Sequence, residues 1–206
     1  MKIIALSGWK RSGKDTAAEL LVKEYGYTAV SFAGVLKDMV AEEYGIPREW
    51  CDDPRYKEAP LKDYPAIPKD PFTEAITGLL KAEINKGYWT PRALCILKGS
   101  VNRAVSSKFW TSRAIKHIQV GQKLDIDKYV ITDLRYKSEV EDLHDSFGSR
   151  LSTIRINRFD TISTTDPSER NLDNYKFDYI VENKKTIEDF KQDLRGVMED
   201  VKCRKG

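Results

Sequence analysis

The residues with the clearest chemical potential lie near the start of the chain, where four residues separate Gly8 from the pair Gly13-Lys14. An apolar run at 3–6 precedes them and an apolar-periodic run at 17–22 follows, which is the strand, loop and helix context of a phosphate-binding loop. Glycines let backbone N–H groups surround phosphate oxygens, and the N-terminus of the following helix adds further donors. Lys14 is therefore expected to reach the β- and γ-phosphates of a nucleotide.

One position departs from the usual phosphate-loop pattern. Asp15 stands where Ser or Thr normally supplies a magnesium ligand, and Thr16 follows it. Two interpretations stay open, in which Thr16 binds the metal or Asp15 acts on it through water. A third treats Asp15 only as an acidic residue that stabilises the positive end of the helix dipole.

The composition indicates one globular domain. The 206 residues, 40% hydrophobic and 33% charged, suffice for a sizeable core. No long apolar run or signal-like N-terminus is present, which predicts a soluble, cytoplasmic protein with no membrane partner. Three widely spaced cysteines fit neither a disulfide framework nor a zinc site and are expected to be bystander thiols. The net charge of +3 permits polyanion binding without demanding it, so no stable nucleic-acid complex is expected.

Strands and helices alternate around the loop. The first helix is expected to end near residues 25–26, followed by a strand at 27–32 and a helix that begins at 33–40. This order is typical of a parallel sheet with helices on its faces, whose ligands bind at the carboxyl ends of the strands. Phe32, Lys37 and Asp38 are then expected near the phosphate loop, although a solvated helix charge explains Lys37 equally well. Further strands are expected at 128–133, 150–156 and 175–182, and a closing helix at 186–201.

The pattern changes between the second helix and the third strand. Six of the eight prolines lie in residues 45–71, which form either a functional excursion over a site or a mobile surface loop. Helices are expected at 72–86, 91–106 and 109–120, the second with Thr90 as its N-cap. An arginine on a helix is usually solvated, but three in this excursion could converge on a phosphate: Arg92, Arg103 and Arg113.

The second half of the chain supplies further candidates. An apolar strand that ends in Asp133 fits the second acidic element of phosphate-loop enzymes, near metal and phosphates; the alternative is a helix cap. Arg135 is placed to clamp an acceptor phosphate. The polar segment 157–174 carries Arg158 and Arg170, and we expect it to cover the nucleotides, exclude water and neutralise the transferring phosphoryl group.

With these pieces placed, the chain resembles the bacteriophage deoxynucleoside monophosphate kinases nearly from end to end. The most specific shared motif is Ser-Gly-Lys-Asp-Thr at 12–16, which also accounts for Asp15. Other matching pieces are Phe-Ala-Gly-Val-Leu-Lys-Asp at 32–38, Pro-Arg-Ala-Leu at 91–94 with Gly99-Ser100, Phe-Trp at 109–110, Thr-Asp-Leu-Arg at 132–135 with Glu139, Ser-Glu at 168–169 and Ile-Val-Glu-Asn at 180–183.

The resemblance implies a three-layer α/β/α P-loop kinase fold with a five-stranded parallel sheet. Its core would comprise about 1–44, 122–156 and 175–206, its helical monophosphate-binding region about 45–121, and its lid about 157–174. It also implies an enzyme that transfers the γ-phosphoryl group of ATP, with Mg²⁺, to a deoxynucleoside monophosphate.

Carried over residue by residue, the resemblance implies four sets of site residues. Phosphoryl transfer would depend on Lys14, Arg135, Arg158 and Arg170. ATP would contact Lys10, Arg11, Ser12, Gly13, Lys14, Asp15 and Thr16, with Asn183 near the adenine. The metal would be held by Asp15, Thr16 and Asp133. The monophosphate would be surrounded by Phe32, Lys37, Asp38, Arg92, Trp110, Asp133, Arg135, Glu139 and Glu169.

Two departures leave the accepted bases open. Ile96 stands where family members often carry Gln, and Ser100 stands where Thr is usual. Two rival functions also stay open: a phosphate-loop kinase for another small acceptor, such as a dephospho-coenzyme A or phosphomevalonate kinase, and a non-catalytic nucleotide- or nucleic-acid-binding module. ATP and a deoxynucleoside monophosphate are the expected partners, and a homodimer is left open.

Overall fold

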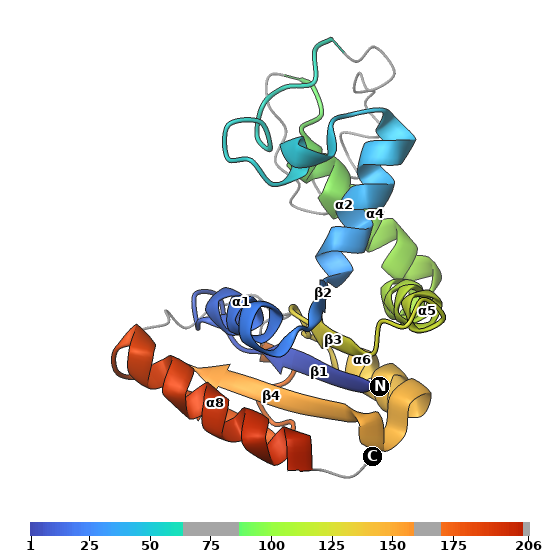
Figure 1. Ribbon diagram of the computed structural model, residues 1–206. Coiled ribbons are helices and arrows are strands. Elements are labelled where there is room, and N and C mark those ends of the chain that lie inside the picture. The colour runs from blue at the N-terminus through green and yellow to red at the C-terminus, as the bar shows by residue number, and fades with distance from the viewer. Residues whose placement is uncertain (64–86, 159–169, 204–206) are drawn as a thin grey trace. The chain divides into compact units, whose positions relative to one another are not determined.

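The structure, a computed structural model, describes residues 1–63, 87–158 and 170–203 (Figure 1). It divides into two compact units, residues 1–32 with 111–206, and residues 33–110. These boundaries differ from the expected ones near residues 44 and 121. Helix α2 (Phe32–Tyr44), expected in the core, belongs after its first residue to the second unit, and most of α5 (Phe109–Gln122) belongs to the first. The expected helix at 72–86 lies outside the described residues.

The first unit is built on the expected five-stranded parallel sheet. Its strands are β1 (Lys2–Ser7), β2 (Thr28–Val30), β3 (Lys128–Ile131), β4 (Leu151–Asn157) and β5 (Tyr179–Glu182), in the order β2-β3-β1-β4-β5. The central β1 pairs with β3 from Lys2↔Lys128 to Ala5↔Ile131, and with β4 from Ile3↔Leu151 to Ser7↔Arg155. Its continuous apolar run follows from this place, because a central strand of a parallel sheet is buried on both faces.

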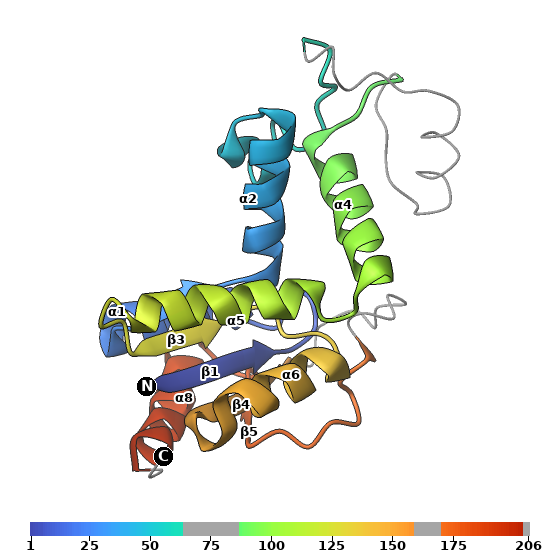
Figure 2. The same ribbon diagram turned by 90° about the vertical axis from the view of Figure 1, so that its right-hand side faces the viewer.

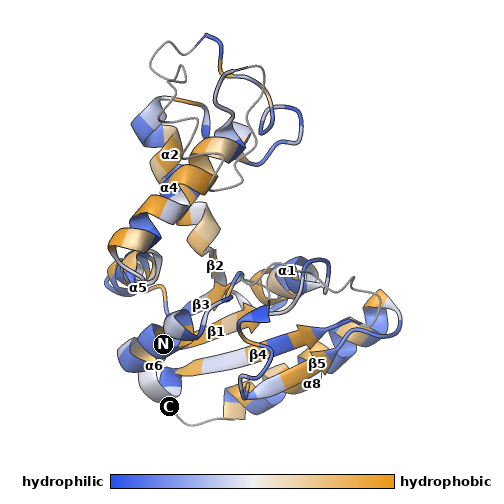
Figure 3. Ribbon diagram, turned by 180° about the vertical axis from the view of Figure 1, so that it is seen from behind, coloured by the Kyte–Doolittle hydropathy of each residue, from blue (hydrophilic) through white to orange (hydrophobic). Residues whose placement is uncertain are grey.

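Helices cover both faces of this sheet. On one face α1 (Lys14–Tyr25) and α8 (Ile187–Cys203) enclose a core cluster with alternate residues of the strands. Figure 3 shows hydrophobic and hydrophilic residues alternating along α8, whose buried side chains recur at helical spacing: Phe190, Leu194, Met198 and Val201. Helix α6 (Lys137–Phe147) lies on the other face and buries Val140, Leu143 and Phe147 (Figure 2).

At two of the strand ends that differ from expectation, acidic side chains replace ladder hydrogen bonds. β5 begins at Tyr179 rather than residue 175, since the Asp178 carboxylate accepts the bonds from the N–H (2.9 Å) and hydroxyl (2.8 Å) of Thr153. β2 ends at Val30 because the Asp133 carboxylate binds the residues that follow it. The pairing is therefore shorter at both outer edges than the apolar runs predicted.

The second unit contains α2, the 3₁₀ helix η1 (Arg48–Cys51) and α4 (Pro91–Val105). Thr90 caps α4 as expected, since its hydroxyl accepts a 3.1 Å bond from the Ala93 N–H. The core of this unit includes Trp89 and Cys51, with Cys95 packed against it. Burial raises the pKa of both thiols, that of Cys95 to about 12, which fits the expected role as unreactive bystanders.

A helix that crosses a bilayer needs about 20 consecutive, predominantly apolar residues. Within residues 1–63, 87–158 and 170–203, no helix is both long and apolar enough to cross a bilayer.

Candidate active site

The loop between β1 and α1 adopts a conformation that depends on glycine. Gly8 has φ 153° and Gly13 has φ 110°. A Cβ atom on Gly8 would lie 2.5 Å from the carbonyl oxygen of Ile156, and one on Gly13 would lie 2.6 Å from Nδ2 of Asn183. Both positions therefore exclude a side chain, which leaves the backbone open to a ligand on the inner side of the loop.

Lys14 lies across this loop. Its Nζ donates to the carbonyl oxygens of Gly8 (2.7 Å) and Trp9 (2.8 Å), and the Trp9 carbonyl also accepts a 3.0 Å bond from the Ser12 N–H. Gly13 stands at the N-cap of α1, and no side chain caps this helix end. Free N–H groups, the helix dipole and an ammonium group thus meet at one place, which suits a phosphate anion.

The residues at the start of α1 fit a magnesium ion that is shared with phosphates. Asp15 is exposed and Thr16 half-buried in the first helical turn, so the chain offers a carboxylate and a hydroxyl oxygen. Within the described part of the chain, no three His, Cys, Asp or Glu side chains are grouped closely enough to hold a metal by themselves. Magnesium commonly binds one or two protein oxygens together with substrate phosphates and water, which is the arrangement this donor set allows.

Asn183 supports the phosphate loop directly. Its side-chain amide donates a 2.9 Å hydrogen bond to the Ser12 carbonyl, and its backbone N–H donates to the Asn157 carbonyl at 2.7 Å. The sequence prediction placed Asn183 near an adenine; the structure shows that its Nδ2 braces the loop, two residues before Lys14. Its expected contact with adenine stays a prediction.

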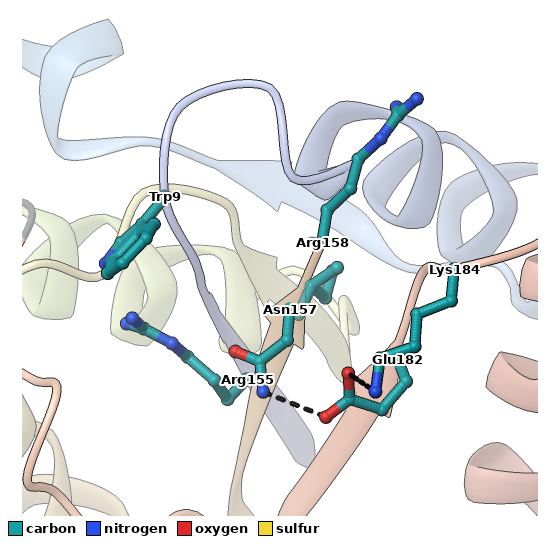
Figure 4. A pocket seen from close by; sticks show the side chains of 7 residues that line it. Trp9, Arg155, Asn157, Arg158, Glu182 and Lys184 are labelled. Carbon is teal, nitrogen blue, oxygen red and sulfur yellow. Dashed lines mark hydrogen bonds and ion pairs between the residues drawn. The ribbon is translucent and has the colours of Figure 1, made fainter. Parts of the chain in front are cut away.

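A hollow of about 250 Å³ opens at the carboxyl ends of β4 and β5 (Figure 4). On its floor Asn157 donates a 3.1 Å bond to Glu182, which pairs with Lys184 at 3.0 Å. The Asn157 bond, opposed by burial and aided by Lys184, lowers the pKa of Glu182. The guanidinium of Arg158 extends away from this pair (Figure 4). The lining residues are Trp9, Arg155, Ile156, Asn157, Arg158, Glu182 and Lys184.

Asp133 lies at the carboxyl edge of the sheet as expected, but its carboxylate binds protein groups. Oδ1 accepts a 2.9 Å bond from the Phe32 N–H, and Oδ2 accepts a 3.0 Å bond from the Ser31 hydroxyl. The side chain thus ties the end of β2 to the end of β3, and it does not cap α6, which begins at Lys137. Its proposed contact with a metal stays a prediction.

Arg135 and Glu139 form a unit in the turn before α6. Glu139 is buried, and its Oε2 accepts bonds from the backbone N–H groups of Arg135 (2.9 Å) and Tyr136 (3.0 Å). The sequence prediction placed Glu139 against the monophosphate. In the structure its carboxylate fixes the backbone that carries the half-buried Arg135.

The second unit holds four of the predicted monophosphate residues, two of them on α2. Lys37 pairs with Asp52, and Arg48 bridges Asp38 (2.5 Å) and Asp52 (2.6 Å). Although burial opposes ionisation of Asp52, the bonds from Lys37 and Arg48 hold its pKa below the usual value. Lys37 and Asp38 are therefore joined through an acidic and a basic residue that the sequence prediction did not include.

The other two predicted monophosphate residues in the second unit are Arg92 and Trp110. Arg92 is bound to Glu58 at 3.0 Å, and its side chain is half exposed. Trp110 is 3% exposed and donates a 3.3 Å bond to the Gly99 carbonyl, which fits a core residue. The predicted residue Glu169 lies outside the described residues, whereas Arg170 is exposed next to Asp173.

Sequence reasoning assigned no individual role to three residues at the phosphate loop: Trp9 within it, and Arg155 and Asp173 beside it. The Trp9 indole donates a 3.0 Å bond to Asp173, which also accepts a 2.8 Å bond from Arg155. A signal was available, because an arginine between two isoleucines in a predicted strand must find a partner when it is buried.

Comparisons with known proteins test the resemblance to the bacteriophage deoxynucleoside monophosphate kinases. A family model described as deoxynucleotide monophosphate kinase matches residues 2–60. The deoxynucleotide monophosphate kinase of Enterobacteria phage T4 is 46% identical over 46 residues, which are 22% of this chain and 19% of that protein. The predicted resemblance to this kinase family is confirmed within residues 2–60, and its predicted extension over the rest of the chain stays a prediction. The match spans about a fifth of the curated relative. The kinase-family region includes the phosphate loop, Phe32, Lys37 and Asp38, whereas Asp133 and Arg135 lie outside it.

Two solved kinase structures are among those to which the chain is similar. Dephospho-CoA kinase from Campylobacter jejuni matches with 14% identity and a TM-score of 0.49 over 97% of both chains. Shikimate kinase from Aquifex aeolicus matches with 17% identity and a TM-score of 0.42 over 96% of both chains. The fold of this chain is given by its own strand order and parallel register.

Proposed function

We propose that this chain is an ATP-dependent kinase that phosphorylates deoxynucleoside monophosphates in the cytoplasm of a host cell. The observation that supports it most is the phosphate loop, in which Gly8 and Gly13 open the backbone and Lys14 lies across it, within the residues that match the kinase family. Its partners are ATP and a deoxynucleoside monophosphate, with no membrane or nucleic acid.

The reaction needs positioning and charge neutralisation rather than a protein nucleophile. An oxygen of the acceptor phosphate forms a bond to the γ-phosphorus as the bond to the bridging β-γ oxygen breaks, so ADP leaves with that electron pair. Lys14 stabilises the negative charge on the phosphates, and Asp15 and Thr16 are the residues that would hold the metal. Magnesium, when bound, neutralises phosphate charge.

Three arginines have the remaining roles in binding the acceptor and neutralising charge. Arg135, whose backbone is held by Glu139, clamps the acceptor phosphate, because a guanidinium presents paired donors that match phosphate oxygens. Arg158 and Arg170 stand at the two ends of the expected lid and supply positive charge toward the transferring group. An arginine used in this way contributes about 10³ to 10⁵ in rate in well-studied phosphoryl-transfer enzymes.

The decisive experiment measures ADP formation from ATP and magnesium with dGMP, dTMP, dCMP and dAMP in turn. Turnover with one or more acceptors, and its loss in Lys14→Ala, is expected. Lys23→Ala is the matched control, because this lysine lies on α1 but pairs only with exposed Glu19 in the contacts described. The control should keep wild-type turnover.

Two results would overturn the proposal. If none of the four deoxynucleotides supports ADP formation and dephospho-coenzyme A does, the chain would be a kinase of the same fold with another small acceptor. ATP binding without any ADP formation, together with DNA binding that weakens steeply with salt, would assign a non-catalytic module.

A further inference from the structure

We propose that Asp173 and Arg155 are positioning residues for the phosphate loop and act on it through Trp9. The inference rests on the proposed function and concerns how the loop is held. Trp9 follows Gly8 in the loop, while Asp173 is 164 residues away in sequence, yet the indole N–H donates a 3.0 Å bond to the Asp173 carboxylate. This bond joins the loop to the segment that leads into β5.

Arg155 makes this connection rigid. The residue is 8% exposed, and its guanidinium donates to the Ser7 hydroxyl (3.2 Å) and to Asp173 (2.8 Å) while lying over the Phe177 ring at 5.7 Å. A buried guanidinium needs a counter-charge, because an unpaired charge away from water is strongly unfavourable. Asp173 supplies that charge, so its carboxylate is held where it also meets Trp9.

The backbone around Asp173 is ordered by its own turn. The Asp173 N–H donates to the Arg170 carbonyl at 3.0 Å, the Tyr175 N–H donates to the Leu172 carbonyl at 3.1 Å, and Leu172 is 1% exposed. The exposed pair between Arg170 and Asp173 is longer, at 3.6 Å, and contributes little. The carboxylate is therefore placed by packing and by Arg155.

Trp9 connects Asp173 to the part of the loop that holds Lys14. Its side chain is bound to Asp173, while its carbonyl accepts bonds from the Lys14 ammonium (2.8 Å) and the Ser12 N–H (3.0 Å). A shift of Trp9 therefore moves an acceptor that holds Lys14. Because Lys14 meets the phosphates of ATP, the network should act on ATP binding more than on the acceptor.

The test titrates the full chain with ATP and magnesium and measures Kd, with kcat and both KM values alongside. Asp173→Asn should weaken ATP binding by about tenfold. Trp9→Phe, which removes the indole N–H together with the pyrrole ring and keeps an aromatic side chain, should weaken it by about threefold. The KM of the deoxynucleotide should change less than twofold. The double variant should bind ATP no more weakly than Asp173→Asn, because both changes break one connection.

Asp193→Asn on α8 is the matched control for lost charge, since this exposed residue has no hydrogen bond or ion pair with the loop in the described structure. The Kd of this variant should equal that of wild type. Asp173→Glu should restore part of the affinity. If Asp173→Asn fails to fold, Trp9→Phe decides alone. An unchanged Kd in Trp9→Phe, additive effects in the double variant, or a lower active fraction at constant Kd would each overturn the proposal. ATP binding without phosphorylation of any deoxynucleotide would overturn the proposed function and leave this test valid.

Discussion

The first unit carries lysine and arginine side chains at both edges of its parallel sheet, where the strands end and where they begin. At the carboxyl edge the helix N-terminus of α1 presents backbone N–H groups without a side-chain cap, and Lys14 lies beside them. Donors and positive charge accumulate there, so the edge as a whole attracts an anion.

At the amino edge the same side-chain types meet helix C-termini, which present carbonyl oxygens. Each cation donates to the last turn of a helix and thereby stabilises the negative end of its dipole. The pairs are Lys2 with Val201 and Lys202 of α8 (3.0 and 2.9 Å), Lys128 with Tyr25 of α1 (3.2 Å), and Arg150 with Phe147 of α6 (3.1 Å).

Neither charge nor size separates these two edges. The amino edge has a hollow of about 370 Å³, larger than the one of about 250 Å³ beside the phosphate loop, and it is lined by Lys2, Lys128 and Arg150. The difference lies in the backbone, which offers donors at one edge and acceptors at the other. Lys14 also donates to carbonyls, those of Gly8 and Trp9, but it lies beside the N–H groups of a helix N-terminus, which attract phosphate as well. The cations of the amino edge lie among helix carbonyls, which repel a phosphate.

Substitution of Lys14 and of Lys2 should show the largest difference between the carboxyl and amino edges. Lys14→Ala should lower kcat/KM by about 10² to 10³, the loss typical of removing one preorganised donor to a charged transition state. Lys2→Ala should leave turnover unchanged and cost about 1 kcal/mol of stability, because it removes a helix C-terminal cation. Steady-state kinetics and thermal unfolding measure both, and an equal kinetic loss in the two variants would contradict the comparison.

The glycines at the two ends of α1 give a second pair. Gly13→Ala should cost about 2 kcal/mol at the loop, or about thirtyfold in kcat/KM, because of its positive φ and because the new Cβ displaces the Asn183 amide from Ser12. Gly26 also has positive φ, at 70°, but a Cβ there meets no atom within 4 Å.

Gly26→Ala should therefore cost roughly 1 kcal/mol of stability with unchanged kinetics. For a chain of this size that corresponds to a fall of about 2–4 °C in Tm. Kinetic constants and Tm of the two variants check this pair, and a kinetic defect in Gly26→Ala would show that loop strain is not specific to the carboxyl edge.

The features of the carboxyl edge that depend on neighbouring residues in the sequence could be predicted. The phosphate loop needs only consecutive residues, Gly8 to Thr16, and the apolar runs on either side gave the strand and helix. The five strands followed from similar runs, whereas their ends did not, because Asp133 and Asp178 replace ladder bonds with side-chain bonds. Helix α6 was not predicted, although Val140, Leu143 and Phe147 have its spacing.

The roles of acidic residues were harder to predict. The contacts of Asp133 and Glu139 with metal or monophosphate stay predictions, because a carboxylate that binds a ligand and one that binds backbone N–H groups look alike in sequence. The link from Trp9 to Asp173 was hidden for another reason, because no local pattern joins residues so far apart in the chain. Only the buried charge of Arg155 signalled that a partner must exist.

The arginines that flank α6 give the smallest contrast. Arg135→Ala at the carboxyl edge should raise the KM of the deoxynucleotide by about tenfold, since a charge-assisted bond contributes about 1.5–3 kcal/mol, with little change in the KM of ATP. Arg150→Ala, at the amino edge, should leave both constants unchanged and lower stability by about 0.5 kcal/mol, because this exposed side chain binds carbonyls of α6 and lies over the Phe147 ring of the same helix. Initial rates at varied deoxynucleotide concentration decide the point. An unchanged acceptor constant in Arg135→Ala would remove Arg135 from the site and limit the anion-binding character of the carboxyl edge to the phosphate loop.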